Sequence, residues 1–481
     1  MAIKFINREK ELGWLNKQYK RAEKEAQLLI LYGKRRVGKT ELVRHFIRDK
    51  KSIYYLANRT TTRTQLQDAT NVFASGFGDK HISTAQFADW RAFFDYIGQK
   101  MKQSSKRTIL IFDEFPFLVE SNSGMSSFFQ YAWDMWLKNT KAVVILMGSS
   151  ISMMYQHALA RNAPLYGRRT GQWLLEPFTY DQAKNFYPNQ KFERTFPLYA
   201  ISGGIPAYAR VFDGRKTFEQ NIQNSILSEG SFLSVEPELL LSDEFIDPRS
   251  YLTILKAIGL GRTRFSQILQ DTDLQATALP GYLKTLINLR LVKREIPVTE
   301  KIPEKSKKGN YSLADAFLRF YFSFIFPHSS LIKSGKHKEL FEQHGKLLTS
   351  LVAKSYEDTT SEFIEKAIQQ GALPPFERLG RWWDKNTEID LVGLNKVENR
   401  ILFVETKWKK NQLGIGVLQD LRQKSQEVKW GSKNRKEFFA LVAKNGFTKN
   451  LIKQAQKEGV LLIHKDKILL GIQDTPGVSY P

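Results

Sequence analysis

A glycine-rich loop between a strand and a helix is the feature that most constrains this chain. Residues 28–32 form an apolar run, residues 33–40 read GKRRVGKT, and an amphipathic pattern continues to residue 47. This is G-x-x-x-x-G-K-T in the strand–loop–helix context that a phosphate-binding loop, or P-loop, requires. Its glycines let successive backbone N–H groups face inward at a helix N-terminus, where they attract anions. The sequence therefore predicts an α/β fold with the parallel sheet of a P-loop NTPase.

Each residue of this loop has an expected task in holding ATP. Lys39 would reach the β- and γ-phosphates, and Thr40 would bind Mg²⁺ through its hydroxyl. The residues expected to cradle the nucleotide are Gly33, Lys34, Arg35, Arg36, Val37, Gly38, Lys39 and Thr40. ATP and Mg²⁺ are therefore the expected cofactors.

A second apolar strand ends in two acids. In RTILIFDEFPFL, residues 107–118, Asp113 and Glu114 follow four apolar residues. Buried acids are costly unless a cation or substrate meets them. Asp113 would bind Mg²⁺ directly or through water, and Glu114 would polarise the attacking water. An acid directly after the Mg²⁺ residue indicates hydrolysis rather than a slow switch.

Two further positions have two interpretations each. Ser149 ends the apolar run 142–148, where it would either sense the γ-phosphate or belong to a helix cap. Arg168, or its neighbour Arg169, lies in the loop PLYGRRTGQW and would be either an arginine finger or a solvated surface residue. An arginine finger would act within one chain or across a homo-oligomer.

Several segments occur in an order that resembles a known family. FINREKELGWL at residues 5–15 is followed by the P-loop, ILIFDEFPFL, LMGSS, LYGRRT and SGGIPAY. The chain resembles prokaryotic, mainly archaeal, P-loop ATPases related to the AAA+ and STAND groups. The resemblance implies that the first segment, with Phe5, Ile6, Asn7 and Arg8, lines the adenine pocket. It also implies a helical lid near the nucleotide that contains residues 203–206, and a C-terminal domain that is uncharacterised but nuclease-like.

The middle of the chain predicts a winged-helix domain at residues 245–328. Two helical patterns, 251–272 with a Gly-Leu-Gly break and 279–289, precede two short strands joined by a polar, lysine-rich tip. The second pattern, with Lys284 exposed and Arg290, Lys293 and Arg294 after it, would be a recognition helix for DNA. Lys305, Lys307 and Lys308 at the tip would contact phosphates. The alternative is a packing module that relays the ATP state to its neighbour.

The C-terminal part, residues 331–481, contains a pattern typical of restriction-endonuclease-like, PD-(D/E)xK, nucleases. EIDLV and ILFVETKW predict a β-hairpin that places Asp390, Glu405 and Lys407 near one another. Asp390 and Glu405 would share Mg²⁺, while Lys407 would orient or deprotonate a water and offset charge on the scissile phosphate. Ile389 stands where the family motif has proline. Glu357 or Glu362 would supply an acid from the preceding helix. The alternative is an ion pair on an edge strand.

Composition narrows the partners. The net charge is +24, and cysteine is absent, which excludes disulfides and thiolate metal sites. A basic surface favours a polyanion, and DNA is the expected one. The N-terminal segment does not read as a signal peptide, and the most apolar stretches, 142–154 and 317–328, are too short for a bilayer. We expect a cytoplasmic protein without membrane segments.

The sequence thus predicts three domains: a P-loop ATPase with a helical lid at 1–240, the winged helix at 245–328, and the nuclease-like domain at 331–481. The leading function is an ATP-hydrolysing, DNA-associated enzyme with a Mg²⁺-dependent nuclease-like domain. One alternative is a STAND-like ATP-driven signalling switch whose C-terminal domain binds a partner and is catalytically inactive. Another is a plain NTPase whose basic surface serves assembly.

Overall fold

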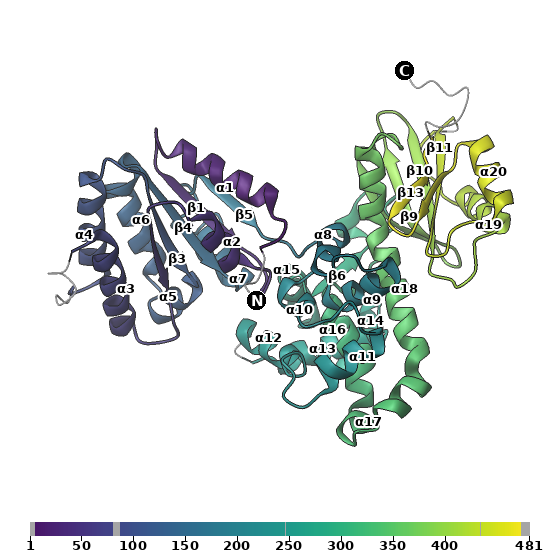
Figure 1. The fold of residues 1–481 in the computed structure, drawn as a ribbon, viewed down its shortest axis with the longest axis horizontal. Helices are drawn as coiled ribbons and strands as arrows, with labels where there is room; N and C mark the ends of the chain where they lie inside the picture. The colour runs from purple at the N-terminus through teal and green to yellow at the C-terminus, as the bar shows by residue number, and fades with distance from the viewer. Residues whose placement is uncertain (1–4, 80–86, 246, 433, 473–481) are drawn as a thin grey trace. The chain divides into compact units, whose positions relative to one another are not determined.

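The computed structural model describes residues 5–79, 87–245, 247–432 and 434–472 (Figure 1). The chain forms two compact units. Unit 1 contains the residues up to 178 with 205–208 and 240–246, and unit 2 contains 179–204, 209–239 and the chain from 247 onward.

Unit 1 is built on a five-stranded parallel sheet with the order β2-β3-β4-β1-β5. The strands are β1 Gln27–Tyr32, β2 Ser52–Leu56, β3 Thr108–Asp113, β4 Ala142–Gly148 and β5 Gly171–Leu174. The helices are α1 Glu9–Arg21, α2 Lys39–Phe46, α3 Thr62–Phe77, α4 Trp90–Gln103, α5 Phe115–Ser121, α6 Met125–Met135 and α7 Ile151–Met154. The predicted P-loop sheet is therefore confirmed.

The central strands of this sheet are apolar on both faces because helices cover both faces. In β1, Leu28 and Ile30 contribute to a core with α3, α4 and α6, whereas Leu29 and Leu31 contribute to a core with α1 and α2. Such near-continuous apolar strands are typical of buried parallel sheets. The carboxyl ends of β1, β3 and β4 meet at one sheet edge, which brings the P-loop, the two acids and Ser149 together.

The first part of unit 2 is helical. It contains α8 Tyr180–Ala183, α9 Phe192–Ser202, α11 Phe218–Ile222, α13 Arg249–Gly259, α14 Phe265–Thr272, α15 Leu279–Asn288, α16 Ala316–Phe320 and α17 Ser329–Lys333. Two short helices, α10 Pro206–Ala209 and α12 Glu236–Glu244, begin or end in the segments of unit 1. After α15, β6 Val292–Glu295 and β7 Asn310–Leu313 form an antiparallel hairpin. These elements follow the order expected for residues 251–313.

The C-terminal part of unit 2 is a mixed six-stranded sheet with the order β13-β12-β11-β10-β9-β8. Its strands are β8 Arg378–Trp383, β9 Glu388–Asn395, β10 Arg400–Lys407, β11 Lys436–Ala443, β12 Leu461–His464 and β13 Lys467–Leu470. The long helix α18 His337–Gln369 contributes to the core on one face, and α19 Ile415–Gln426 and α20 Lys449–Glu458 to the core on the other. The expected hairpin is confirmed, because β9 and β10 pair antiparallel.

The segment expected to be the lid of the ATPase domain shares its core with the C-terminal sheet. Phe192 and Phe196 of α9 pack with Tyr356 of α18 and with Trp408, which follows β10. The ring centroids of Phe196 and Trp408 lie 5.3 Å apart. Residues 179–204 therefore belong to the same compact unit as β10.

None of the described helices combines the length and the apolar character needed to cross a membrane.

Candidate functional site

The P-loop connects β1 to α2 through a backbone that only glycine accommodates at two positions. Gly33 has φ +156°, and a Cβ atom there would collide with the carbonyl oxygen of Leu175. Gly38 has φ +92° and lies beside Pro206, whose Cγ is 3.9 Å from the position of a Cβ on Gly38. Because glycine has no Cβ atom, the backbone can adopt these conformations at both positions. The loop therefore curls onto the N-terminus of α2. Pro206 belongs to the G-G-I-P segment, and the structure places it next to the loop.

Lys39 is buried inside this curl. Its Nζ donates to the carbonyl oxygens of Gly33 at 2.9 Å and Lys34 at 3.0 Å. Burial lowers the pKa of Lys39 to about 8, although the nearby acids Glu114 and Asp113 partly oppose this shift. Phosphate oxygens would favour the ammonium form again, so the side chain is positioned to bind an anion.

Thr40 and Asp113 join the P-loop to the acidic strand β3. The Thr40 hydroxyl donates to Asp113 Oδ2 over 2.9 Å, and the Tyr54 hydroxyl donates to the same oxygen. Asp113 is 1% exposed and also accepts from the backbone N–H of Glu114 at 2.9 Å. A hydroxyl and a carboxylate side by side are hard oxygen donors of the kind Mg²⁺ prefers, so these residues fit the expected ion.

Glu114 is held next to Ser149. Glu114 Oε2 accepts from the backbone N–H of Ser149 at 3.3 Å and from its hydroxyl at 3.0 Å. The backbone of Glu114 is left-handed, with φ +53°. A non-glycine residue in that region costs about 1–3 kcal/mol and persists where the surroundings enforce it, which is frequent at functional sites. Ser149 is not the cap of α7, because that position belongs to Ser150, whose hydroxyl accepts from the backbone N–H of Met153.

Arg8 fastens the N-terminal segment to the P-loop. Its guanidinium donates to the carbonyl oxygens of Val37 at 3.0 Å and Glu176 at 2.8 Å, and it lies 4.0 Å from the Phe178 ring centroid. Burial lowers the pKa of Arg8, against the opposing effect of Glu11. Arg8 is therefore saturated by protein contacts. Ile6 is half-buried, so it is more accessible than Arg8, and its contact with an adenine base stays a prediction.

Arg168 is engaged away from the P-loop. Its Nε donates to Asp134 Oδ2 at 2.9 Å, and a terminal nitrogen donates to the Pro164 carbonyl at 2.9 Å. Arg169 donates to the carbonyls of Ala158 and Leu159. The structure thus pairs Arg168 with Asp134 and the Pro164 carbonyl, and the arginine finger stays a prediction.

Glu244 is a site residue that sequence reasoning missed. Its carboxylate accepts from the hydroxyls of Ser150 at 3.2 Å and Ser152 at 3.5 Å. Burial raises the pKa of Glu244 to about 7, and the positive charges of Lys39 and Lys34 limit the rise. An acid that interacts with both P-loop lysines occupies the surroundings in which phosphates would bind. No local motif identifies it, because Glu244 lies about 200 residues after the loop.

The acids of the C-terminal hairpin converge as predicted. Asp390 Oδ2 accepts from the backbone N–H of Thr406 at 2.8 Å. Lys407 Nζ lies 2.5 Å from Glu405 Oε1 and 3.9 Å from Asp390 Oδ2. Asp390, Glu405 and Lys407 thus form one cluster at the carboxyl end of β10.

The electrostatics of this cluster follow from its burial. Burial and the Glu405 charge raise the pKa of Asp390. Burial alone would lower the pKa of Lys407, but Glu405 and Asp390 outweigh it and raise that pKa overall. Lys407 is therefore a stable cation, suited to offset charge rather than to take a proton.

Helix α18 offers two acids, and only one lies at the cluster. Burial and the charge of Asp390 raise the pKa of Glu357 to about 8. Arg381 also contacts Glu357, at 3.5 Å. Glu362 instead accepts from the backbone N–H of Tyr180 at 3.0 Å and from the Tyr199 hydroxyl at 3.2 Å. Glu357 is thus the acid adjacent to Asp390, whereas Glu362 fastens α18 to the segment around α8 and α9.

Lys424 of α19 was not predicted and contacts Glu405 at 3.1 and 3.3 Å. Among the described residues, no three His, Asp or Glu side chains come close enough to form a ready-made metal cage. Mg²⁺ typically takes only one or two carboxylates and keeps several waters. Asp390 and Glu405 supply two carboxylates, which fits Mg²⁺. They do not fit a metal whose ligands must all come from protein side chains.

Two family models match parts of the chain. A model described as an ATPase domain predominantly from Archaea matches residues 5–209. A second model, described as Archaea bacterial proteins of unknown function, matches residues 321–438. The first match contains the P-loop and both acids of β3, and the second contains Asp390, Glu405 and Lys407.

Individual relatives were also found. The chain is 34% identical over 447 residues, 92% of this chain and 95% of the other, to an uncharacterized protein of Methanocaldococcus jannaschii. It is 47% identical over 49 residues, 10% of this chain, to an uncharacterized ATP-binding protein of the same organism, of which it covers 80%. A Walker-type ATPase of Pyrococcus abyssi has a similar fold, with a TM-score of 0.50, 22% identity, and coverage of 66% of this chain and 96% of that one.

Proposed function

The chain belongs to the family of the Methanocaldococcus jannaschii protein that it matches over nearly its whole length, and its N-terminal part is an archaeal-type P-loop ATPase domain; from this premise we propose a DNA-associated ATPase with a Mg²⁺-dependent nuclease site in its C-terminal part. We assign the ATPase activity to residues 1–240, the DNA contact to residues 245–328 and the nuclease site to residues 331–481.

The nucleotide part hydrolyses ATP with residues from three strand ends. Lys39 binds the phosphates, and Thr40 with Asp113 would hold Mg²⁺ between them. Bound Mg²⁺ would neutralise charge on the β- and γ-phosphates. Glu114 orients and activates the attacking water, and its contact with Ser149 fixes the carboxylate before ATP arrives. This hydrogen bond supports hydrolysis over mere binding, because it preorganises a general base.

The convergence of Asp390, Glu405 and Lys407 is the observation that carries the nuclease proposal. Mg²⁺ held by the two carboxylates would polarise a phosphodiester and activate a water. The water oxygen would add to phosphorus as its proton passes to solvent, and the leaving oxygen would depart with the electrons of its bond. Lys407 would offset the negative charge that develops. The stable positive charge of Lys407 supports this role rather than that of a base.

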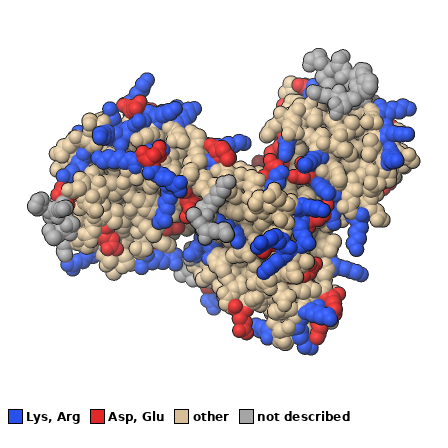
Figure 2. All heavy atoms as spheres, viewed as in Figure 1, with Lys and Arg blue, Asp and Glu red and all other residues tan. Residues whose placement is uncertain are grey.

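A DNA contact would come from the helices and hairpin at 245–328. The order α13, α14, α15 and then β6–β7 supports a winged helix, and Lys284, Lys305 and Lys307 are exposed. Lys293 instead pairs with Asp358 at 3.4 Å, and Arg294 donates to the Ser306 carbonyl. Figure 2 shows lysine and arginine side chains scattered over the visible face, with acidic side chains and broad areas of other residues between them. The expected DNA surface therefore consists of α15 and the hairpin tip, without Lys293 and Arg294.

The packing of α9 offers a route between the two activities. Residues 179–204 follow β5 of the ATPase domain directly in the chain, and they contact α18 and Trp408. Trp408 is the neighbour of Lys407. A change of the lid segment on ATP binding would therefore reach the strand that carries the nuclease residues.

The contact of Lys424 with Glu405 favours a second candidate function. A second lysine at 3.1 Å satisfies the charge of Glu405 without a metal. In that case the C-terminal part would be an inactive binding module of an ATP-driven switch. The two candidates differ in whether DNA is cut.

A paired assay separates these functions. ATP turnover and cleavage of plasmid, linear and single-stranded DNA and of RNA are measured with Mg²⁺, with and without ATP. We expect Lys39→Ala to abolish phosphate release, and Glu405→Ala to abolish cleavage while phosphate release continues. If the parent protein releases phosphate but cuts no substrate with Mg²⁺ or Mn²⁺, the nuclease proposal fails and the switch is favoured. Unchanged phosphate release in Lys39→Ala would refute the nucleotide assignment.

A further inference from the structure

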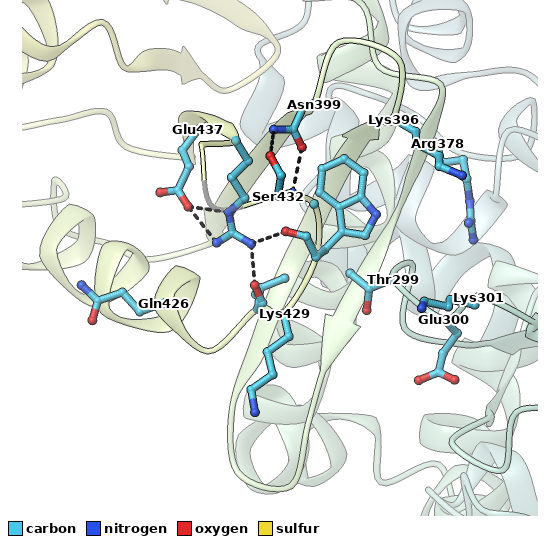
Figure 3. Close-up of a pocket in the computed structure, with 14 residues that line it drawn as sticks. Thr299, Glu300, Lys301, Arg378, Lys396, Asn399, Gln426, Lys429, Ser432 and Glu437 are labelled. Carbon is cyan, nitrogen blue, oxygen red and sulfur yellow. Dashed lines mark hydrogen bonds and ion pairs between the residues drawn. The ribbon is translucent and has the colours of Figure 1, made fainter.

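A large groove lies within unit 2, near the start of β10 and away from the acids at its end. Its volume is about 1400 Å³, and its walls come from the segment 299–301 and from the loop between α19 and β11 (Figure 3). Small-molecule pockets typically measure about 300–1,000 Å³. The size of the groove therefore favours a polymer over a small ligand.

The segment after β6 forms one wall and is firmly anchored. The backbone N–H of Val298 donates to the Arg381 carbonyl of β8 at 2.9 Å, and Val298 is 5% exposed in a core with Trp382. Gly380 gives it room, because a Cβ there would lie 3.2 Å from Val298 Cβ. This wall is thus fixed onto the edge of the C-terminal sheet.

The opposite wall is fixed by Arg435 and Asn399. Arg435 donates to the carbonyls of Val428 at 2.5 Å and Trp430 at 2.9 Å, and it pairs with Glu437 at 2.7 Å. Asn399 exchanges two hydrogen bonds with Ser432, at 2.6 and 3.1 Å, as Figure 3 shows. These contacts hold residues 428–432 and Arg435 in place.

The charges in the groove do not cancel. Its two acids are already neutralised, Glu300 by Lys308 at 3.0 Å and Glu437 by Arg435. Four further cations line the groove, are exposed, and form no ion pair within the described part of the chain: Lys301, Arg378, Lys396 and Lys429. Such a set of cations, spread over both walls, matches the repeated charges of a phosphate backbone.

Trp430 adds an aromatic surface to the same groove. It lines the groove and is half-buried, with part of its side chain against the core beneath. A basic groove with an aromatic side chain is the arrangement that binds single strands, because phosphates meet the cations and a base stacks on the ring.

We propose that this groove binds a single strand of nucleic acid, with Lys301, Arg378, Lys396 and Lys429 on its phosphates and Trp430 against a base. The inference rests on the nucleic-acid association proposed above and names its form. The distance along β10 from Asn399 to Glu405 is about 20 Å. The groove is thus a second contact, separate from the residues that would cut.

The test is fluorescence anisotropy of the full-length protein with labelled dT20, rU20 and a 20-base-pair duplex, in EDTA and without ATP, over a salt series. For Lys396→Ala/Lys429→Ala we expect at least about tenfold weaker binding of single strands, and a salt slope smaller by about 1.4, because two phosphate contacts are lost. Trp430→Leu should weaken binding about 5- to 100-fold, and Trp430→Phe should retain most of it. Comparison of dT20 with rU20 identifies DNA or RNA as the preferred strand.

Lys449→Ala/Lys453→Ala of α20 is the matched control, since it removes the same charge from exposed positions of the same part of the chain. An equal loss of single-strand affinity in the control and groove variants would overturn the proposal. It would also be overturned if the duplex bound more tightly than the single strands and only duplex binding depended on the groove residues. The outcome is independent of cutting. Groove-dependent binding without any cleavage contradicts only the nuclease site, and cleavage with groove-independent binding contradicts only the groove.

Discussion

Lys424 Nζ lies 3.1 Å from one oxygen of Glu405 and 3.3 Å from the other, so a lysine from α19 covers the carboxylate that would hold the metal. Lys407 contacts the first of these oxygens as well. Glu405 is therefore shared by two cations, and a third, divalent one must displace or rearrange at least one of them.

Lys424→Ala should strengthen metal binding. Removal of one positive charge beside Glu405 lowers the repulsion that Mg²⁺ meets, so the concentration for half-maximal cleavage should fall several-fold. A Mg²⁺ titration of DNA cleavage measures this, with the exposed Lys410→Ala as control. A higher Mg²⁺ requirement in Lys424→Ala would show instead that Lys424 belongs to the catalytic residues.

Glu114→Gln should bind ATP and hardly hydrolyse it. The amide keeps an acceptor for the Ser149 hydroxyl but cannot take a proton, so turnover should drop about 10²- to 10⁴-fold. Phosphate release and retention of labelled ATP after gel filtration measure the two steps. Glu120→Gln, an exposed acid on α5, is the control. Turnover of Glu114→Gln at the parental rate would mean that another base acts.

Glu244→Gln should bind ATP about 5- to 10-fold more tightly at pH 8. Glu244 has a pKa of about 7, so at pH 8 it is ionised and repels the phosphates near Lys39. Below its pKa the carboxyl is protonated, and the affinities of parent and variant should converge at pH 6. Nucleotide titration calorimetry at both pH values checks this, with Glu238→Gln as control. Weaker binding in Glu244→Gln would reveal an attractive role, for instance through Mg²⁺.

The stability of the protein should fall as pH rises from about 4.5 to about 7 because of Glu362. Burial raises its pKa to about 7 from the usual 4.5. In that window the folded state holds a proton that the unfolded state has released, so ionisation costs folding free energy. Above about pH 7 both states are ionised, and this contribution is fully lost.

Glu362→Gln should therefore show a smaller decrease of the unfolding midpoint between pH 5 and pH 8 than the parent. Urea or thermal unfolding at both pH values measures it. Glu342→Gln, exposed on the same helix, should behave like the parent. Some pH dependence stays in the variant, because Glu357 also has a raised pKa, of about 8. Identical pH dependence in parent and Glu362→Gln would contradict this account.

Local motifs made the nucleotide site predictable. The glycines of the P-loop permit its curled backbone, and this depends on the local sequence alone. The carboxyl ends of neighbouring parallel strands lie at the same edge of a sheet, so the residues that follow them come together. For the same reason the hairpin register of β9 and β10 followed from two apolar runs and a short turn. Asp113, Glu114, Glu405 and Lys407 lie near or directly after the end of a strand, where side-chain direction follows from position in the strand.

Tertiary packing decided what the sequence left open. Glu357 and Glu362 are five residues apart, so they lie on different faces of α18, and only the packing of that helix tells which face meets Asp390. Glu244 and Lys424 reach their sites from elements that no motif includes. Arg168 looked free in sequence, and its contact with Asp134 became visible only when α6 was placed.

The most direct test of the account is the cleavage rate of labelled DNA in Mg²⁺ by the parent protein and by Asp390→Asn, with ATP turnover measured in the same samples. Asn keeps the shape of Asp390 and an acceptor for the Thr406 N–H but removes the charge that would bind the metal. We predict cleavage by the parent, a loss of at least about 100-fold in Asp390→Asn, and equal phosphate release. Cleavage by Asp390→Asn at the parental rate would contradict the account, as would a parent protein that hydrolyses ATP and cuts nothing.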